Sequence, residues 1–176
     1  MSCQPMNRMT GFSLTEVLVA MLVLALGLLG LAALQIAGVR SNQTAYYRSI
    51  ATQLAYDIAD RMRANPVGVA AGLYNNNKGT PGTSLTQQCD TASCTPDVLA
   101  AYDLNQWAYA LNNNLPNGSG IVCSITSAYG TPLLLGDSSA SCSGSVGNVY
   151  VVKVWWNDDR SGSTTQGFVT SFQLGN

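Results

Sequence analysis

The sequence predicts an α+β protein in which a long N-terminal helix packs on an antiparallel sheet. Three observations support this prediction. Val17–Val39 contains no charged residue, and about 20 apolar residues are enough to cross a bilayer as a helix. Helix-compatible sequence then continues to Asn65-Pro66. Segments rich in β-branched and aromatic residues, which favour strands, come only in the C-terminal third.

The composition excludes several classes of function. The chain has 176 residues, a net charge of -1 and only 8 Lys and Arg, too few for binding nucleic acid by phosphate neutralisation. It has no histidine, which excludes Ser-His-Asp and Cys-His catalysis and removes the commonest zinc ligand. No catalytic carboxylate pair, phosphate loop or nucleophile–base pair is evident. We therefore expect no enzyme, no catalytic residue, no metal site and no cofactor.

The apolar segment is expected to remain in the mature protein. Aliphatic residues cover the helix on every side, as when each face meets lipid or other apolar helices. A buried core helix is the alternative, but a domain of this size rarely encloses one so long. A secretory signal would end in a cleavage site after small residues, and no such site followed by a loop appears near Leu34.

A short motif precedes the apolar segment. Met1–Gly11 is polar, Phe12 follows it, and Glu16 stands five residues after Gly11 at the start of the apolar run. A carboxylate in or at the edge of a bilayer is costly and usually has a partner or a function. The first turn of a helix also favours an acidic residue through the helix dipole.

Residues 11–21, GFSLTEVLVAM, resemble the type III signal of type IV pilins and type II secretion pseudopilins. The resemblance implies that residues 1–11 are a leader peptide. It implies cleavage between Gly11 and Phe12 by prepilin peptidase on the cytoplasmic side, followed by N-methylation of Phe12. It also implies that Glu16 sets the axial register of assembly by meeting the amino group of Phe12, on its own or a neighbouring subunit.

Further segments are similar to minor pilins of the PilV type. They are residues 24–35, 59–66 and 103–107. One departure concerns the second half of the apolar run, where major pilins carry a helix-softening proline and this chain has Ala33. Gly27, Gly30 and Gly38 are candidates to soften the helix instead, because glycine lowers helix stability by about 1 kcal/mol relative to alanine.

The resemblance implies a minor pilin that takes part in priming and in the tip complex of a type IV pilus, supporting twitching motility and adhesion. The implied partners are other minor pilins, the major pilin, a tip adhesin, prepilin peptidase and the inner-membrane assembly platform. The implied location is the inner membrane, single-pass with a periplasmic C-terminal domain, and then the fimbrium at the cell surface. A minor pseudopilin of a type II secretion system is the alternative. A single-span periplasmic binding protein with an uncleaved N-terminus is a third.

The long helix is expected to have two parts. Residues 12–39 form the transmembrane or filament-core part, and residues 40–66 form an amphipathic part that precedes a periplasmic head at 67–176. A spacing of four predicts one apolar stripe, made of Tyr46, Ile50, Leu54, Ile58 and Met62. Asp57 and Arg61 lie one turn apart and form a weak ion pair.

Five cysteines bear on the compartment, namely Cys3, Cys89, Cys94, Cys123 and Cys142. Cys3 would leave with the leader, and four cysteines in an exported domain suggest disulfides with three possible connectivities. We favour the sequence-local pairs Cys89–Cys94 and Cys123–Cys142. Free buried thiols in a cytoplasmic domain are an alternative, and a four-thiolate zinc site is disfavoured because paired C-x2-C elements are missing. Disulfides would place residues 41–176 in an oxidising compartment.

The head is expected to begin with a loop over residues 67–95. Thr95-Pro96 then starts a helix that runs to about Asn113, with a second short helix re-capped by Asp103 and Gln106. A turn follows at residues 116–118. The predicted strands are residues 120–126, 149–156 and 167–174, with 131–135 as a weaker candidate.

Two smaller features complete the head. Residues 157–162 cluster oxygen ligands that suit calcium, namely Asn157, Asp158, Asp159, Ser161 and Gly162. A polar hairpin loop explains the same residues more simply, and we favour that interpretation. Trp155 and Trp156 are adjacent, so on a strand they face opposite sides; we expect one in the core and the other toward a partner subunit.

Overall fold

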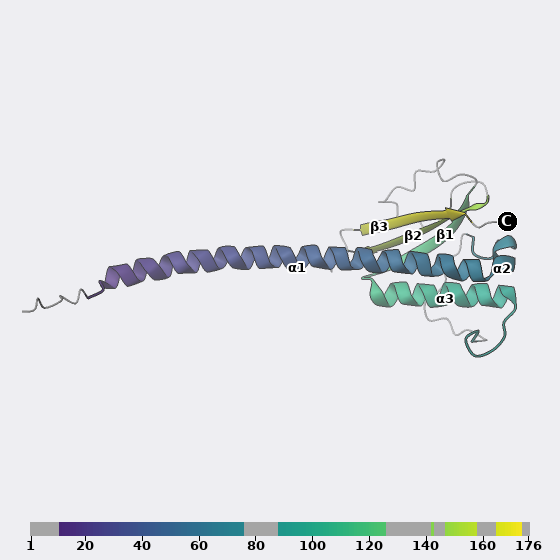
Figure 1. Ribbon diagram of the computed structural model, residues 1–176, viewed down its shortest axis with the longest axis horizontal. Helices are drawn as coiled ribbons and strands as arrows, with labels where there is room; N and C mark the ends of the chain where they lie inside the picture. Colours follow the sequence, from purple (N-terminus) through teal and green to yellow (C-terminus); the bar gives the residue numbers. More distant parts are fainter. Residues whose placement is uncertain (1–10, 76–87, 126–141, 143–146, 158–164, 174–176) are drawn as a thin grey trace, which may run out of the picture. The chain divides into compact units, whose positions relative to one another are not determined.

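The computed structural model describes residues 11–75, 88–125, 142, 147–157 and 165–173, and these have the predicted α+β fold (Figure 1). The helices are α1 (Leu14–Ala64), α2 (Pro66–Ala70) and α3 (Pro96–Asn114). The strands are β1 (Ser119–Ile125), β2 (Val149–Asn157) and β3 (Thr165–Gln173). The chain divides into two units, residues 1–43 and residues 44–176, so α1 contributes to both.

The described part of the first unit is the N-terminal half of α1 and the three residues before it. The carbonyl oxygen of Ser13 accepts the backbone N–H of Glu16 at 3.0 Å and of Val17 at 3.3 Å, which starts the helix. By length and composition α1 can cross a membrane, and none of its most apolar window is buried. The alternative of a buried core helix is therefore wrong, because such a helix would have its faces covered.

The second half of α1 presents one face to the core of the second unit. Its buried residues are Ala51, Ala55, Ile58, Ala59 and Met62, and Tyr47, Ile50 and Leu54 pack at the margin. Tyr46, the predicted first member of the stripe, is instead 59% exposed. Each step of four residues rotates about 40° past a full turn, so the predicted stripe drifts around the helix. Alternating steps of four and three residues stay on one face of the helix, and they connect Tyr47 with Ala51, Leu54 and Ile58 on the core side.

The dipeptide Asn65-Pro66 both ends α1 and begins α2, where the sequence predicted a loop. Asn65 is the N-cap of α2, and its side-chain oxygen accepts the N–H of Gly68 at 3.1 Å. Pro66 occupies the first turn, where no backbone N–H is needed. One pair of residues is thus a stop signal for one helix and a start signal for the next.

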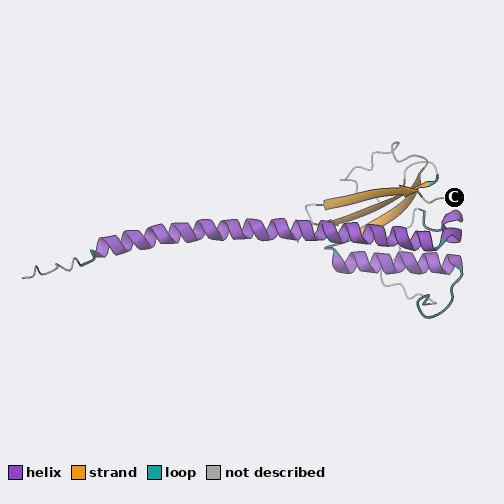
Figure 2. Cartoon of the chain, in the orientation of Figure 1, coloured by secondary structure: helices purple, strands orange, loops and turns teal. Residues whose placement is uncertain are grey.

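α3 is a single helix from Pro96 to Asn114, so the predicted second cap at Asp103 was wrong. α3 lies beside the second half of α1 (Figure 2), and the indole N–H of Trp107 donates to the carbonyl of Leu54 at 2.9 Å. Ala100, Leu104, Trp107 and Leu111 join the core cluster from α3. The turn after α3 places Asn117 at a φ of 51°.

The three strands form an antiparallel sheet in the order β1-β2-β3. The core lies between one face of this sheet and the two helices, and includes Val122, Tyr150, Val152, Val154 and Trp156. A smaller cluster covers the other face and contains Ile121, Cys123, Ile125 and Val151. Trp156 lies in the first cluster and Trp155 packs on the second, which confirms that they face opposite sides.

Two arginines of α1 reach β3. The guanidinium of Arg48 donates to the side-chain oxygen of Gln166 at 3.5 Å, and Arg63 lies over the Phe172 ring at 5.3 Å from its centroid. The earlier arginine contacts the start of β3 and the later one contacts its end, so α1 and β3 run in the same direction. The candidate strand 131–135, residues 158–162 of the candidate calcium loop and Leu174 lie outside the described residues.

Candidate functional site

The N-terminal candidate site consists of the residues just before and inside the first turn of α1. Gly11, Phe12 and Ser13 precede the helix, and Glu16 is the acidic residue of its first turn. The Phe12 side chain is 84% exposed, and Glu16 is also exposed. The peptide bond between Gly11 and Phe12 thus lies in non-helical chain next to a helix start.

Glu16 shares a face of α1 with two glycines. Glu16, Gly27 and Gly38 are spaced by 11 residues, and 11 residues exceed three full turns by only about 20°. A Cβ built on either glycine meets nothing within 4 Å. Small residues let apolar helices approach closely in a membrane. The face therefore combines one carboxylate with two positions suited to close helix packing.

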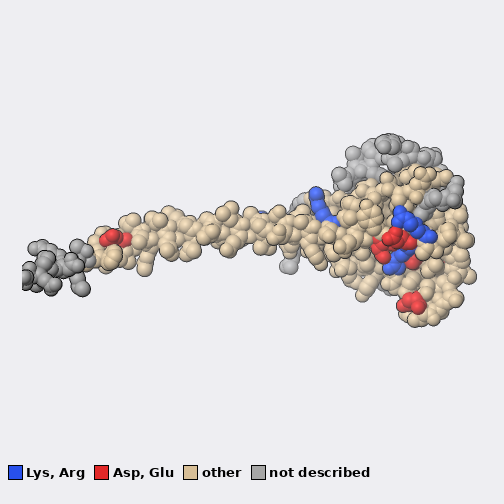
Figure 3. Space-filling model, in the orientation of Figure 1, with Lys and Arg blue, Asp and Glu red and all other residues tan. Residues whose placement is uncertain are grey.

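The N-terminal part of α1 carries few charges. Between residues 11 and 43 the charged residues are Glu16 and Arg40. Figure 3 shows the uncharged stretch of α1 that follows the acidic group near its start. Residues 17–39 can therefore lie in an apolar environment without burying a charge.

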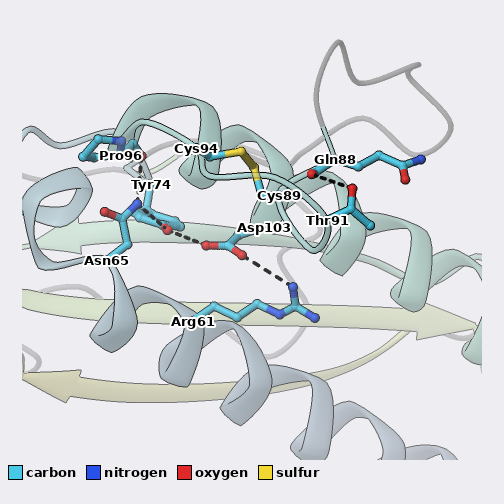
Figure 4. Close-up of a disulfide and its surroundings, with 9 residues drawn as sticks. All are labelled: Arg61, Asn65, Tyr74, Gln88, Cys89, Thr91, Cys94, Pro96 and Asp103. Atoms are coloured by element: carbon cyan, nitrogen blue, oxygen red, sulfur yellow. Dashed lines mark hydrogen bonds and ion pairs between the residues drawn. A yellow bond between two sulfur atoms is a disulfide. The ribbon is translucent and has the colours of Figure 1, made fainter.

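A second candidate site is a buried polar cluster in the head (Figure 4). The Tyr74 hydroxyl donates to Oδ2 of Asp103 at 2.7 Å. The Asn65 amide nitrogen donates to the Tyr74 oxygen at 3.1 Å and to the carbonyl of Pro96 at 2.8 Å. Arg61 lies 3.5 Å from Oδ1 of Asp103, and its Nε donates to Asp57 at 2.9 Å. The Asp57–Arg61 pair predicted from the sequence is therefore confirmed.

Burial dominates the electrostatics of this cluster. It raises the pKa of Asp103, while the hydroxyl of Tyr74 and the charge of Arg61 act in the opposite direction. Burial and the bond to Asp103 also raise the pKa of Tyr74, so Tyr74 remains a neutral donor. Within the described residues, no group of three His, Cys, Asp or Glu side chains is arranged to hold a metal ion. The cluster is therefore a structural network that joins α1, the segment after α2, and α3.

Two disulfides lie in the second unit, Cys89–Cys94 and Cys123–Cys142. These are the sequence-local pairs. The first closes a ring directly before α3, two residues from the Pro96 carbonyl that accepts from Asn65. The second ties β1 to residue 142. Both bridges suit a domain that matures in an oxidising compartment.

The buried cluster was not predicted from the sequence. In the sequence, Asp103 has the chemistry of a helix cap and Tyr74 lies in the loop expected over residues 67–95. A signal was present, because Asp103 lies three residues after Ala100 and four before Trp107, both buried. An acidic residue on the apolar side of a helix needs a partner. Spacing along α3 does not identify that partner, because Tyr74 comes from a different segment.

Two models of known protein families match this chain, and together they cover residues 6–105. Residues 6–32 match the family model of the prokaryotic N-terminal methylation motif. Residues 33–105 match the model described as type IV pilin Tt1218. No curated protein and no solved structure matches the chain.

Proposed function

Because this chain is a type IV pilin or pseudopilin family protein with an N-terminal methylation motif, we propose that it is a minor pilin of the PilV type. It would take part in the priming and tip complex of a type IV pilus and so support twitching motility and adhesion. The observation that carries the proposal is a helix whose residues 17–39 are uncharged and which holds Glu16, Gly27 and Gly38 on one face. Proteins of this family are structural and not enzymes.

The methylation motif implies processing by prepilin peptidase. We propose that the peptidase cuts between Gly11 and Phe12, that residues 1–11 are the leader, and that Phe12 is then N-methylated. The exposed, non-helical position of Gly11 and Phe12 before α1 supports this assignment. Cys3 would leave with the leader, and each remaining cysteine then takes part in one of the two bridges.

The role proposed for α1 is packing. In the inner membrane, residues 12–39 would be surrounded by lipid, and on assembly they would enter a bundle of like helices without leaving an apolar environment. Glu16 would meet the amino group of Phe12 on its own or a neighbouring subunit, since a cation within about 4–6 Å favours an ionised carboxylate. Gly27 and Gly38 on the same face would let that neighbour come close.

The partners that follow from this proposal are other minor pilins, the major pilin, a tip adhesin and the inner-membrane assembly platform. Before assembly, residues 40–66 and the head at 67–176 would lie in the periplasm. After assembly they would be part of the fimbrium at the cell surface. The membrane-anchoring helix is consistent with both locations.

Deletion of the gene tests the proposal against its alternative. A minor pilin predicts loss of surface pili and of twitching with normal release of secreted enzymes. A minor pseudopilin of a type II secretion system predicts the opposite pattern. N-terminal sequencing of the purified protein tests processing separately, because a single-span binding protein would keep Met1 whereas a pilin begins at methylated Phe12.

A further inference from the structure

The uncharged segment of α1 has a defined length. Residues 17–39 between Glu16 and Arg40 number 23, which corresponds to about 35 Å of helix. The hydrocarbon core of a bilayer is about 30 Å thick, and a tilt of about 30° lies within the range of membrane helices. One placement therefore puts Glu16 and Arg40 at opposite edges of the hydrocarbon.

We propose that Arg40 binds the phosphate groups of anionic phospholipids in the periplasmic leaflet and thereby holds α1 in the membrane before assembly. Arg40 is exposed, and the fork of donors of a guanidinium group matches phosphate oxygens in a bidentate way. Ser41, Asn42 and Gln43 follow it, and these uncharged hydrogen-bonding side chains suit the headgroup layer. This inference rests on the proposed function in one respect, which is that residue 40 lies on the periplasmic side of the membrane.

The position of Arg40 around the helix supports a lipid partner. Arg40 lies two residues after Gly38, and around the helix it is about 160° from Gly38, about 140° from Gly27 and about 120° from Glu16. Before assembly α1 would be surrounded by lipid, and helix contacts through the face of Glu16, Gly27 and Gly38 would still leave Arg40 on the lipid side. A basic residue on the periplasmic side also opposes the usual charge bias of membrane proteins, and anionic headgroups offset that effect.

The lipid preference can be measured on the purified full chain in vesicles. Cys3→Ser removes the fifth cysteine, and Ala37→Cys carries a fluorophore about one turn before Arg40. Phosphatidylglycerol or phosphatidylcholine, each spin-labelled at the headgroup, then quenches the fluorophore according to its occupancy beside residue 40. We expect about fivefold preference for phosphatidylglycerol, the factor for one basic residue at an anionic surface.

Arg40→Gln should abolish this preference, and Arg40→Lys should retain most of it. Arg48→Gln is the matched control and should leave the preference unchanged. The inference is overturned if Arg40→Gln keeps the preference, or if Arg48→Gln removes it to the same extent. The measurement uses no other assembly component, so its outcome is independent of whether the protein serves a pilus or a secretion system.

Discussion

The Tyr74 hydroxyl donates a 2.7 Å hydrogen bond to the Asp103 carboxylate, and this bond joins the segment after α2 to the middle of α3. Tyr74 is fully buried and Asp103 is 5% exposed. Asn65, at the junction of α1 and α2, donates to the same hydroxyl. Three segments are therefore held together by polar groups that would be costly to bury alone.

Tyr74→Phe tests the importance of this bond. The substitution keeps the ring and removes the hydroxyl, so Oδ2 of Asp103 and one Asn65 N–H each lose a partner. We expect the free energy of unfolding of the head to fall by about 1–3 kcal/mol. Guanidinium unfolding followed by the fluorescence of buried Trp107 and Trp156 measures this change.

Tyr109→Phe is the control for that substitution, because Tyr109 lies on α3 but is 56% exposed. It should change the free energy of unfolding by no more than about 0.5 kcal/mol. Equal effects of the two substitutions would contradict a special role for the Tyr74–Asp103 bond.

The raised pKa of Asp103 predicts a pH dependence of stability. Burial, the largest cause, holds this pKa above the ordinary value of an aspartic acid, so the folded head binds the proton more tightly than the unfolded chain. The resulting stabilisation is fully present below the unfolded pKa and is lost as pH rises through the folded pKa. Asp103→Asn keeps an oxygen acceptor for Tyr74 and does not titrate. Its stability relative to wild type should therefore increase from about pH 3 to pH 7.

Unfolding measured at a series of pH values checks this expectation. A constant difference between Asp103→Asn and wild type across that range would show that Asp103 has the same pKa in both states. A decrease of the difference toward neutral pH would show that Arg61 and Tyr74 outweigh burial.

Periodicity and capping residues predicted much of this fold. α1 follows from an uncharged run continued to Asn65-Pro66, and α3 follows from Thr95-Pro96 with apolar residues at helical spacing. The predictions were wrong where tertiary contacts determine which side chains are buried. Tyr46 fits a spacing of four, but the sheet selects the face that contains Tyr47. Asp103 has cap chemistry, but burial beside Tyr74 gives it a different role.

The two disulfides are expected to contribute unequally. The Cys123–Cys142 bridge spans a sequence separation of 19 and the Cys89–Cys94 bridge a separation of 5. In the chain-entropy model the stabilisation is about 3 kcal/mol for the longer loop and about 2 kcal/mol for the shorter one. Replacing each pair by serines and measuring thermal unfolding tests the order. A larger loss for the Cys89–Cys94 pair would contradict the model for this head.

Gly120 is expected to be essential for packing of α3 on β1. An added Cβ would lie 2.5 Å from the Trp107 ring, 2.8 Å from the carbonyl oxygen of Lys153 and 2.9 Å from Leu111. Gly120→Ala therefore forces helix and strand apart and should cost about 1–3 kcal/mol. Ser171→Ala, at an exposed position of β3, is the control for a substitution in the same sheet. Equal unfolding midpoints for the two variants would mean that the contact is relieved cheaply.

Glu16→Ala tests the assembly role of the carboxylate. The substitution leaves residues 17–39 unchanged, so the chain should still enter the membrane, and it leaves Gly11-Phe12 intact, so the leader should still be removed. Assembly should fall, because the amino group of Phe12 would lose its opposite charge in an apolar bundle. Membrane fractionation and N-terminal sequencing check the first two expectations, and quantification of surface pili checks the third.

Gln35→Ala is the matched control, since Gln35 is a polar residue of the same apolar helix but lies about 80° from Gly27 around it. Its removal should leave piliation near the wild-type level if the face of Glu16, Gly27 and Gly38 is the one that packs. Gly27→Leu extends the test, because it keeps the charge and adds bulk where two helices would approach. Loss of pili in Glu16→Ala and Gly27→Leu, but not in Gln35→Ala, would assign assembly to that face. Normal piliation with Glu16→Ala as the sole copy would show that the carboxylate does not set the register.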